Sequence, residues 1–431
     1  MDIDHTSDLQ IDHFERYGRH LRIAVVTETY PPEVNGVALT LHQLVQQMLM
    51  RQHSVQLIRL RQPADTAGQP MAAHAVQAAQ EEGLHPIEHE PPILMRGIPI
   101  PRYPGLRMGV PCKQALVRLW SVRRPDVVHI ATEGPLGWSA LRAAQQLKLP
   151  VSSDFRTNFH AYSRHYGVGV LFRTIMLILR KFHNRTDLTM VPTAALREEL
   201  NKGGFKRLTV VGRGVDAGAF SPHHRSDELR RQWGLQPQDP AVLVLGRVAA
   251  EKNLPLAIRA FQAALAQCPK ARLIVVGDGP MRQALQAQWP EAVFTGMLRG
   301  AELARCVASC DLLLFPSVTE TYGNVVVEAM ASGVPPVAFH MAAAAELVRS
   351  GVNGWTVAPG DERSFVDAAV HAVVQGPARS AAGVRAQETV AALDWAVIAQ
   401  QFEQALMQLV DARQRLASAP GFSLTSWAGR S

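Results

Sequence analysis

The sequence contains no long uncharged apolar run. None of its stretches reaches the roughly 20 apolar residues that cross a bilayer as a helix. The N-terminal segment MDIDHTSDLQIDHFERYGRH is mostly polar and has no apolar centre of the kind that a signal peptide needs. A membrane-spanning or exported protein is therefore not expected, and the sequence predicts a cytoplasmic one.

Cysteine is scarce as well. The 4 cysteines are too few and too irregularly spaced for a disulfide framework, which indicates a reducing compartment. Cys306 and Cys310 share one helical face without histidine nearby, so we expect both to be small buried apolar side chains and not metal ligands. No metal site and no cofactor is predicted.

Long basic tracts are also missing. The net charge of +7 favours an anionic partner such as a nucleotide or an anionic membrane surface. Lys and Arg are dispersed, however, and no aromatic residues interleave with them as in a nucleic-acid module. Nucleic acid is therefore not an expected partner.

What the sequence does contain is a repeated alternation of short apolar runs and helical segments, the pattern of parallel α/β sheets. The first series of expected strands is 21–27, 54–60, 126–131, 150–155, 188–192 and 208–211, with a helix over 37–52. The second series is 241–245, 272–276, 292–295, 311–315 and 336–339. The fold class is therefore α/β, with two doubly wound domains.

We expect an N-terminal domain over 1–218 and a C-terminal domain over 219–394. The segment 395–431 contains a last helix over 395–416, which can cross back to the first domain, and a frayed tail. Ligands of such sheets bind beyond the carboxyl ends of the strands, so the chemistry is expected in a cleft between the two domains.

The segment Gly246-Arg247-Val248-Ala249-Ala250-Glu251-Lys252-Asn253 places two cations next to one strand end. Arg247 follows the strand directly and Lys252 lies near the start of the next helix, so both can converge on one diphosphate. Taken alone, such residues are more often solvated surface charges. Fixed cations can stabilise a departing phosphate without a metal, and the paired aspartates of metal-dependent sites occur here only as Asp2-Ile3-Asp4.

A second motif follows the expected strand 311–315. Gly323 and Asn324 fall at a predicted helix start, where backbone amides and the helix dipole bind anions. Glu320 precedes that start and Glu328 lies inside the helix, so the two carboxylates can reach different hydroxyl pairs of one ligand. For Glu328, the alternative is a hydrogen bond to a neighbouring loop.

Together, Arg-x4-Lys and Glu-x7-Glu, inside the segments 246–253 and 316–329, resemble the signature of retaining GT-B glycosyltransferases of group 1. The segments TETYPPEVNGV (27–37), EGPLG (133–137) and FRTNFH (155–160) are similar to a narrower branch. That branch contains the GDP-mannose-dependent α-mannosyltransferases and their sulfoquinovosyl- and glycolipid-transferring relatives. The resemblance extends over roughly residues 21–402.

The resemblance implies two Rossmann-like domains that face a cleft, and transfer of a hexosyl group from a nucleotide-diphosphate sugar to a lipid-linked or glycan acceptor, without a metal. GDP-mannose is the first choice of donor, and a UDP-sugar remains an alternative. By position, the implied catalytic residues are Glu320, Arg247, Lys252, His160 and Asn158. The implied donor-binding residues are Asn35, Gly36, Arg213, Gly246, Gly277, Gly279, Tyr322, Gly323, Asn324, Val325 and Glu328.

Two positions depart from the family pattern. Relatives often carry a histidine where this chain has Asn158, so the role stays open between Asn158 and His160. Relatives usually carry asparagine where this chain has Arg213, which adds a cation near the cleft. Gly277 and Gly279 are read equally as donor contacts or as a plain turn.

The acceptor side is less defined. The apolar segment 168–185 ends in basic residues and is read either as a helix at an anionic membrane surface or as a core helix. Arg96, Arg102, Arg107 and Lys113 form a second basic region that could guide a lipid head group. Two other functions also remain open, a nucleotide-sugar-binding protein without turnover and a sugar-nucleotide epimerase.

Overall fold

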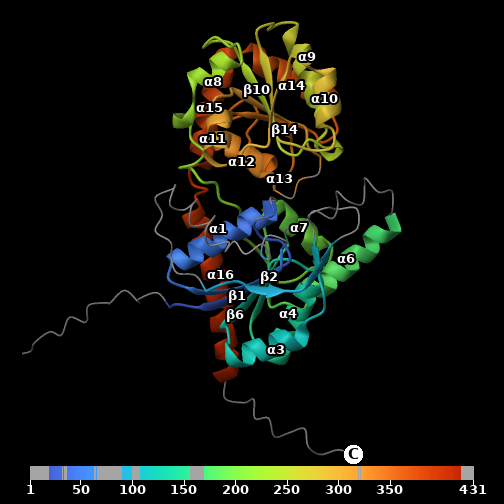
Figure 1. Ribbon diagram of the computed structural model, residues 1–431, viewed down its shortest axis with the longest axis vertical. Helices are drawn as coiled ribbons and strands as arrows, with labels where there is room; N and C mark the ends of the chain where they lie inside the picture. Colours follow the sequence, from blue (N-terminus) through green and yellow to red (C-terminus); the bar gives the residue numbers. More distant parts are fainter. Residues whose placement is uncertain are drawn as a thin grey trace, which may run out of the picture.

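The computed structural model describes residues 19–31, 33, 36–62, 65, 90–99, 107–155, 169–318, 320 and 322–418. These residues form two parallel sheets, each flanked by helices and well separated along the long axis of the molecule (Figure 1). The α/β class with two doubly wound sheets, predicted from the alternating pattern, is confirmed.

The N-terminal sheet has the order β3-β2-β1-β6-β7-β8-β9 and all its pairings are parallel. Its strands are β1 (Arg22–Thr27), β2 (Ser54–Leu60), β3 (Ile93–Met95), β6 (Val127–Ile130), β7 (Val151–Asp154), β8 (Leu188–Val191) and β9 (Leu208–Val210). Its helices are α1 (Gly36–Met50), α3 (Lys113–Val122), α4 (Pro135–Gln146), α6 (Gly169–His183) and α7 (Ala194–Lys202). A small antiparallel pair, β4 (Gly97–Pro99) and β5 (Arg107–Gly109), lies beside this sheet.

The C-terminal sheet has the order β12-β11-β10-β13-β14-β15 and is also parallel. Its strands are β10 (Ala241–Leu245), β11 (Arg272–Val276), β12 (Val293–Gly296), β13 (Leu312–Phe315), β14 (Pro336–Phe339) and β15 (Trp355–Val357). Its helices are α8 (Asp227–Gln232), α9 (Leu254–Leu265), α10 (Arg282–Gln288), α11 (Gly300–Ala308), α12 (Asn324–Ala331), α13 (Ala342–Leu347), α14 (Glu362–Val374) and α15 (Gly376–Val390). Short 3-10 turns cover Pro222–His224 and Ala250–Lys252.

Every strand expected from the sequence is present, with bounds within one residue of the prediction. The strands that were not predicted are β3, β4, β5 and β15. Each is three residues long, which is too short for an apolar pattern to stand out, and β4 and β5 contain glycine or proline. β3 and β15 are edge strands, and each pairs with a single neighbouring strand.

The last helix, α16 (Trp395–Ser418), packs against the N-terminal sheet and not against the domain that precedes it (Figure 1). Trp395, Phe402 and Leu406 share one core with Leu41 of α1 and Val25 of β1. The chain therefore passes between the two halves a second time. The two crossings lie side by side, because Val215 N–H donates to the carbonyl oxygen of Leu393 over 2.8 Å.

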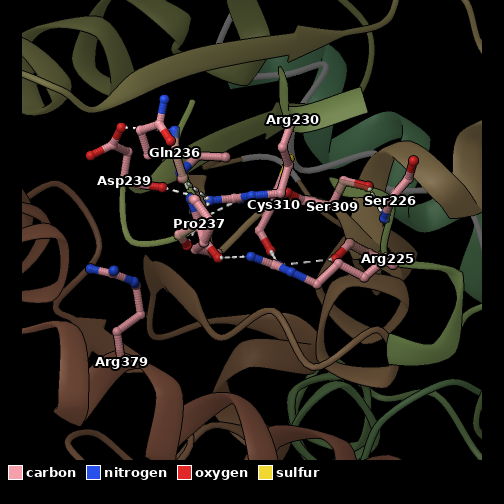
Figure 2. A network of polar contacts seen from close by, with 12 residues as sticks. Arg225, Ser226, Arg230, Gln236, Pro237, Asp239, Ser309, Cys310 and Arg379 are labelled. Atoms are coloured by element: carbon pink, nitrogen blue, oxygen red, sulfur yellow. Dashed lines mark hydrogen bonds and ion pairs between the residues drawn. The ribbon is translucent and has the colours of Figure 1, made fainter. Parts of the chain in front are cut away.

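A buried arginine network closes the amino ends of β10 and β13 (Figure 2). Arg230 is 2% exposed and donates to Asp311 Oδ2 at 2.9 Å and to the Asp239 carbonyl oxygen at 2.6 Å. Arg225 donates to the second oxygen of Asp311 at 2.8 Å, and Asp311 Oδ2 also accepts from the N–H of Ala241. These bonds pair the buried Arg230 with a carboxylate and with backbone carbonyl oxygens, as stability requires. The network lies at the sheet end opposite to the candidate site.

Cys306 and Cys310 are 1% and 2% exposed, as expected for small apolar side chains. Among the residues that the structure describes, no three His, Cys, Asp or Glu side chains are grouped so that they could hold a metal ion.

Candidate functional site

Arg247 and Lys252 lie at the carboxyl end of β10 and line one shallow pocket. Gly246, Phe315 and Pro316 complete the wall of that pocket. β10 ends at Leu245, and the 3-10 turn Ala250–Lys252 brings the second cation back to the strand end before α9 begins. The two cations that the sequence motif pairs are therefore brought together by the fold.

The two cations have different partners. Lys252 Nζ forms an ion pair with Glu320 Oε1 and lies 5.8 Å from the centre of the Phe315 ring. The side chain of Arg247 is 63% exposed and reaches Glu251 at 3.5 Å, a weak contact. Lys252 and Glu320 are thus held in place, whereas Arg247 has freedom to turn toward an anion in the pocket.

The glycines of two adjacent loops allow the loops after β10 and β11 to meet backbone to backbone. Gly246 N–H donates to Val276 over 3.0 Å, and Val248 N–H donates to Asp278 over 2.9 Å. A Cβ atom on Gly277 would lie 2.0 Å from the carbonyl oxygen of Gly246, and Gly277 has φ +133°. The packing of these loops therefore requires Gly277 whether or not it also contacts a ligand.

The loop after β13 leads into α12 through Gly323, which has φ +90°, a conformation that favours glycine. Asn324 is the first residue of α12, so its amide and that of Val325 have no carbonyl partner within the helix. Tyr322 is 4% exposed, and burial raises the pKa of its hydroxyl to about 12. The helix start that the sequence predicted at Gly323 and Asn324 is present, and anion binding there stays a prediction.

Three elements from both halves of the molecule converge at that helix start. Arg213, in the loop after β9, donates from Nη1 to Asn324 Oδ1 over 3.0 Å. A Cβ atom on Gly36, at the start of α1, would lie 3.5 Å from the same Nη1. The amino ends of α1 and α12 therefore face one guanidinium group.

Glu328 lies in α12, half-buried between the site and the core. Burial raises the pKa of its carboxyl from 4.5 to about 7. No hydrogen bond joins its carboxylate to another of the described residues, so the loop contact considered from the sequence is not formed by that part of the chain. A half-buried carboxylate of this kind is suited to accept from a pair of ligand hydroxyls.

The N-terminal side of the cleft has a carboxylate to which the sequence assigned no role. Glu28 follows β1 and accepts a hydrogen bond from the N–H of Leu136, at the start of α4, over 2.8 Å. Burial raises the pKa of the Glu28 carboxyl, and the nearby Glu133 adds to this, while the backbone N–H groups of Leu136 and Gly109 oppose it. Glu133 in turn contacts the buried His183 at 3.2 Å. The position of Glu28 directly after a buried strand is the signal that could have identified it.

Three predicted site residues, Asn35, Asn158 and His160, lie outside the described residues, as do Arg102 and Arg156. The open choice between Asn158 and His160 remains a prediction.

Comparisons with known proteins agree with this geometry. The models Glycosyltransferase Family 4 and Glycosyl transferases group 1 match residues 34–218 and 239–374. A GDP-mannose-dependent alpha-mannosyltransferase of Mycolicibacterium smegmatis is 34% identical over 88% of this chain and 95% of that protein. The sulfoquinovosyl transferase SQD2 of Arabidopsis thaliana is 31% identical over 70% of this chain and 60% of its own length. The Anabaena protein HepE, solved in complex with UDP-glucose, matches with a TM-score of 0.68 and 21% identity, covering 90% of this chain and 100% of HepE.

Two parallel sheets with Rossmann-like topology, and a cation and carboxylate site at the strand ends, define the GT-B class of sugar-nucleotide enzymes. The chain belongs to the group 1 glycosyltransferase family and is a glycosyltransferase that uses a nucleotide-sugar donor. The resemblance inferred from the motifs is confirmed.

Proposed function

We propose that the protein transfers mannose from GDP-mannose, with retention of anomeric configuration and without a bound metal, to a hydroxyl of a lipid-linked or glycan acceptor. The single observation that supports this most is the ion pair of Glu320 with Lys252, which lines one pocket together with Arg247. The similarity to mannosyltransferases over 88% of the chain supports the choice of donor.

On the donor side, Arg247 and Lys252 neutralise the diphosphate, and the amides at the start of α12 add fixed donors. Glu320, held by Lys252, accepts from hydroxyls of the sugar, and Glu328 accepts from the ribose diol. Gly246, Gly277 and Gly279 shape the loop that faces the nucleotide, whereas Gly36 approaches the phosphates from the N-terminal domain. A donor contact by Asn35 stays a prediction from the sequence.

Charge develops on the departing phosphate oxygen as the bond to the sugar breaks. Lys252 and Arg247 stabilise this charge more in the transition state than in the bound donor, which accelerates the reaction. With retention, the acceptor hydroxyl attacks from the face that the nucleotide leaves, and the departing phosphate oxygen takes its proton. The N-terminal domain then has to orient the acceptor, a role for which Asn158 and His160 are the first candidates.

We propose that α6 holds the protein at an anionic membrane surface, where a lipid-linked acceptor would be found. Leu177 and Ile178 are 54% and 50% exposed, next to Arg180 and Lys181 at the end of the same helix. Leu179 and Phe182 of the same helix are buried and pack in the core, so α6 carries both core residues and exposed apolar residues. An exposed apolar pair beside cations fits an interface of acyl chains and anionic head groups. None of the described helices is both long and apolar enough to span a bilayer.

A UDP-sugar is the second candidate donor, because HepE was solved with UDP-glucose. Thermal unfolding of the purified protein with GDP, UDP and their sugars, with and without EDTA, separates the two. The bound donor raises the melting temperature by mass action. A shift with GDP-mannose that survives EDTA, followed by mannose transfer to extracted lipids, supports the proposal. A shift with UDP-sugars alone overturns the donor, and consumption of the donor without any acceptor indicates an epimerase.

Vesicle sedimentation tests the membrane surface. The protein should sediment with vesicles of anionic lipid and not with vesicles of neutral phosphatidylcholine. Replacement of both Leu177 and Ile178 by serine should release it, while replacement of Val397, an apolar residue on α16 that is 41% exposed, by serine serves as the control. Equal sedimentation of all three proteins would contradict a role for α6.

A further inference from the structure

One buried arginine spans the junction between the two domains. Arg213 is only 4% exposed, and its Nη1 donates to Asn324 Oδ1 at the first residue of α12 over 3.0 Å. Its guanidinium carbon lies 5.6 Å from the centre of the Tyr322 ring. The Tyr322 hydroxyl donates back to the carbonyl oxygen of Arg213 over 3.4 Å. Arg213 is thus tied to the start of α12 by its side chain and by its backbone.

The same guanidinium faces the start of α1. A Cβ atom on Gly36 would lie 3.5 Å from Arg213 Nη1 and 4.0 Å from Asn324 Nδ2. Helix amino ends carry partial positive charge. The Arg213 guanidinium adds a full charge of the same sign between two such ends, so the local field favours an anion. The charge arrangement is therefore suited to a phosphate group.

We propose that Arg213 is a positioning residue for the donor, which aligns the amino end of α12 with that of α1 so that both domains bind one diphosphate. It acts through Asn324 and the Tyr322 ring, whereas Arg247 and Lys252 act on the phosphates directly. This inference rests on the proposed function, because it takes a nucleoside diphosphate as the ligand.

A second contact between the domains provides a matched control. Glu346 of α13 accepts a hydrogen bond from the N–H of Ala194, the first residue of α7, over 2.8 Å. It joins the same two domains, and its charge acts on the Tyr322 hydroxyl, but its described hydrogen bonds involve neither Gly36 nor Asn324. Glu346→Ala therefore weakens the domain junction and leaves the hydrogen bond from Arg213 to Asn324 in place.

The test compares the dissociation constants of GMP and GDP by calorimetry, or of UMP and UDP if the wild type prefers uridine. The dissociation constant of the monophosphate divided by that of the diphosphate measures how much the second phosphate strengthens binding. In Arg213→Met and Asn324→Ala this ratio should fall by about tenfold or more, as expected when a hydrogen bond to a charged group is lost. Glu346→Ala should leave it unchanged, and Arg213→Lys, which keeps the charge and one donor, should recover part of it. In turnover, Arg213→Met should raise the donor KM more than it lowers kcat.

A folded Arg213→Met protein with the wild-type ratio would overturn the inference and leave the proposed function intact. An equal fall in the ratio with Glu346→Ala would overturn it as well, because any weakened junction would then have the same effect. If Arg213→Met does not fold, Asn324→Ala takes its place in the test, and a wild-type ratio in Asn324→Ala would overturn the inference. A wild-type protein that binds no nucleoside diphosphate would refute the inference and the proposed function together.

Discussion

The interiors of the two sheets differ in chemistry. In the C-terminal sheet, β10, β13 and β14 read AVLVL, LLLF and PVAF, and every residue in them is buried and apolar. In the N-terminal sheet, the central strands carry polar side chains at the same depth. These residues, all at most 1% exposed, are His129, Ser152, Ser153, Asp154 and Thr189.

The polar residues of the N-terminal sheet bind one another. His129 contacts Ser152 at 3.0 Å and Asp154 at 3.2 Å, and Ser153 contacts His183 at 2.9 Å. Buried polar groups are costly unless each finds a partner, so this layer depends on all of its members. The C-terminal sheet instead confines the polar groups of the site to the loops at its strand ends. We therefore expect loop substitutions in the C-terminal domain to affect binding and catalysis, and sheet substitutions in the N-terminal domain to affect folding.

The largest effect should come from Lys252→Met. Removing one fixed donor from a developing oxyanion lowers kcat by about 100- to 1,000-fold. The melting temperature should fall as well, because the Lys252 and Glu320 side chains are only 24% and 14% exposed and the change leaves Glu320 without its cation. Steady-state transfer and thermal unfolding measure the two quantities, and Arg259→Met, an exposed cation on α9, is the control. A kcat of Lys252→Met close to that of the wild type would show that Lys252 does not stabilise the transition state.

The second largest effect should come from His129→Leu in the N-terminal sheet. It deprives Ser152 and Asp154 of a buried partner and should lower the free energy of unfolding by about 3 kcal/mol. In the C-terminal sheet, the volume-conserving change Leu313→Met should cost less than about 1.5 kcal/mol. Urea unfolding followed by tryptophan fluorescence compares the two proteins. Equal losses would mean that the polar layer makes the N-terminal sheet no more sensitive than its counterpart.

A smaller loss of stability should follow from Gly277→Ala. Its Cβ atom would collide with the carbonyl oxygen of Gly246, which has to move. Gly246→Ala is the matched control, since Gly246 has a similar φ of +136° but no atom within 4 Å of the added Cβ. Both changes introduce backbone strain, and Gly277→Ala should cost about 2 kcal/mol more. If the two variants have the same melting temperature, the loops after β10 and β11 can move apart at little cost and their close contact does not require Gly277.

The last prediction concerns pH. With a folded pKa of about 7 and an ordinary value of 4.5, the folded state holds the Glu328 proton more tightly than the unfolded state does. The free energy of unfolding should therefore fall as pH rises from 4.5 to 7, and Glu328→Gln should abolish this part of the slope. Nucleotide affinity should change in the opposite direction, rising about tenfold through pH 7, since the ionised carboxylate accepts more strongly from the ribose diol. The Glu328→Gln protein also shows how much of the pH dependence comes from the titration of the nucleotide itself. If nucleotide affinity depends on pH in the same way in Glu328→Gln and in the wild type, Glu328 does not bind the ribose.

The sequence was most informative where local chemistry decides structure. The apolar runs located the central strands to within one residue, and the spacing of Arg247, Lys252 and Glu320 predicted a site that the fold brings together. The start of α12 was readable because glycine at position 323 and the motif around it mark a strand-to-helix turn.

What the sequence could not supply depends on contacts between distant segments. The bond from Arg213 to Asn324 joins residues 111 positions apart, and no spacing rule connects them. Glu28 acquires its environment from Leu136 and Gly109, which approach it only after the sheet has formed. The glycines at 277 and 279 looked like a turn near the ligand, and their close contact with the loop after β10 required the paired strands β10 and β11.

The return of α16 to the first sheet also sets an order for biosynthesis. Residues of β1 and α1 leave the ribosome early, yet part of their core is formed by Trp395, Phe402 and Leu406 near the other end of the chain. The nascent N-terminal half must therefore wait, with that apolar face uncovered, until the whole C-terminal domain has been translated. Such waiting intermediates are the ones that chaperones protect from aggregation. In chain order, the domain of the second sheet is an insertion within the domain of the first sheet, and the first domain to begin folding is the last to finish.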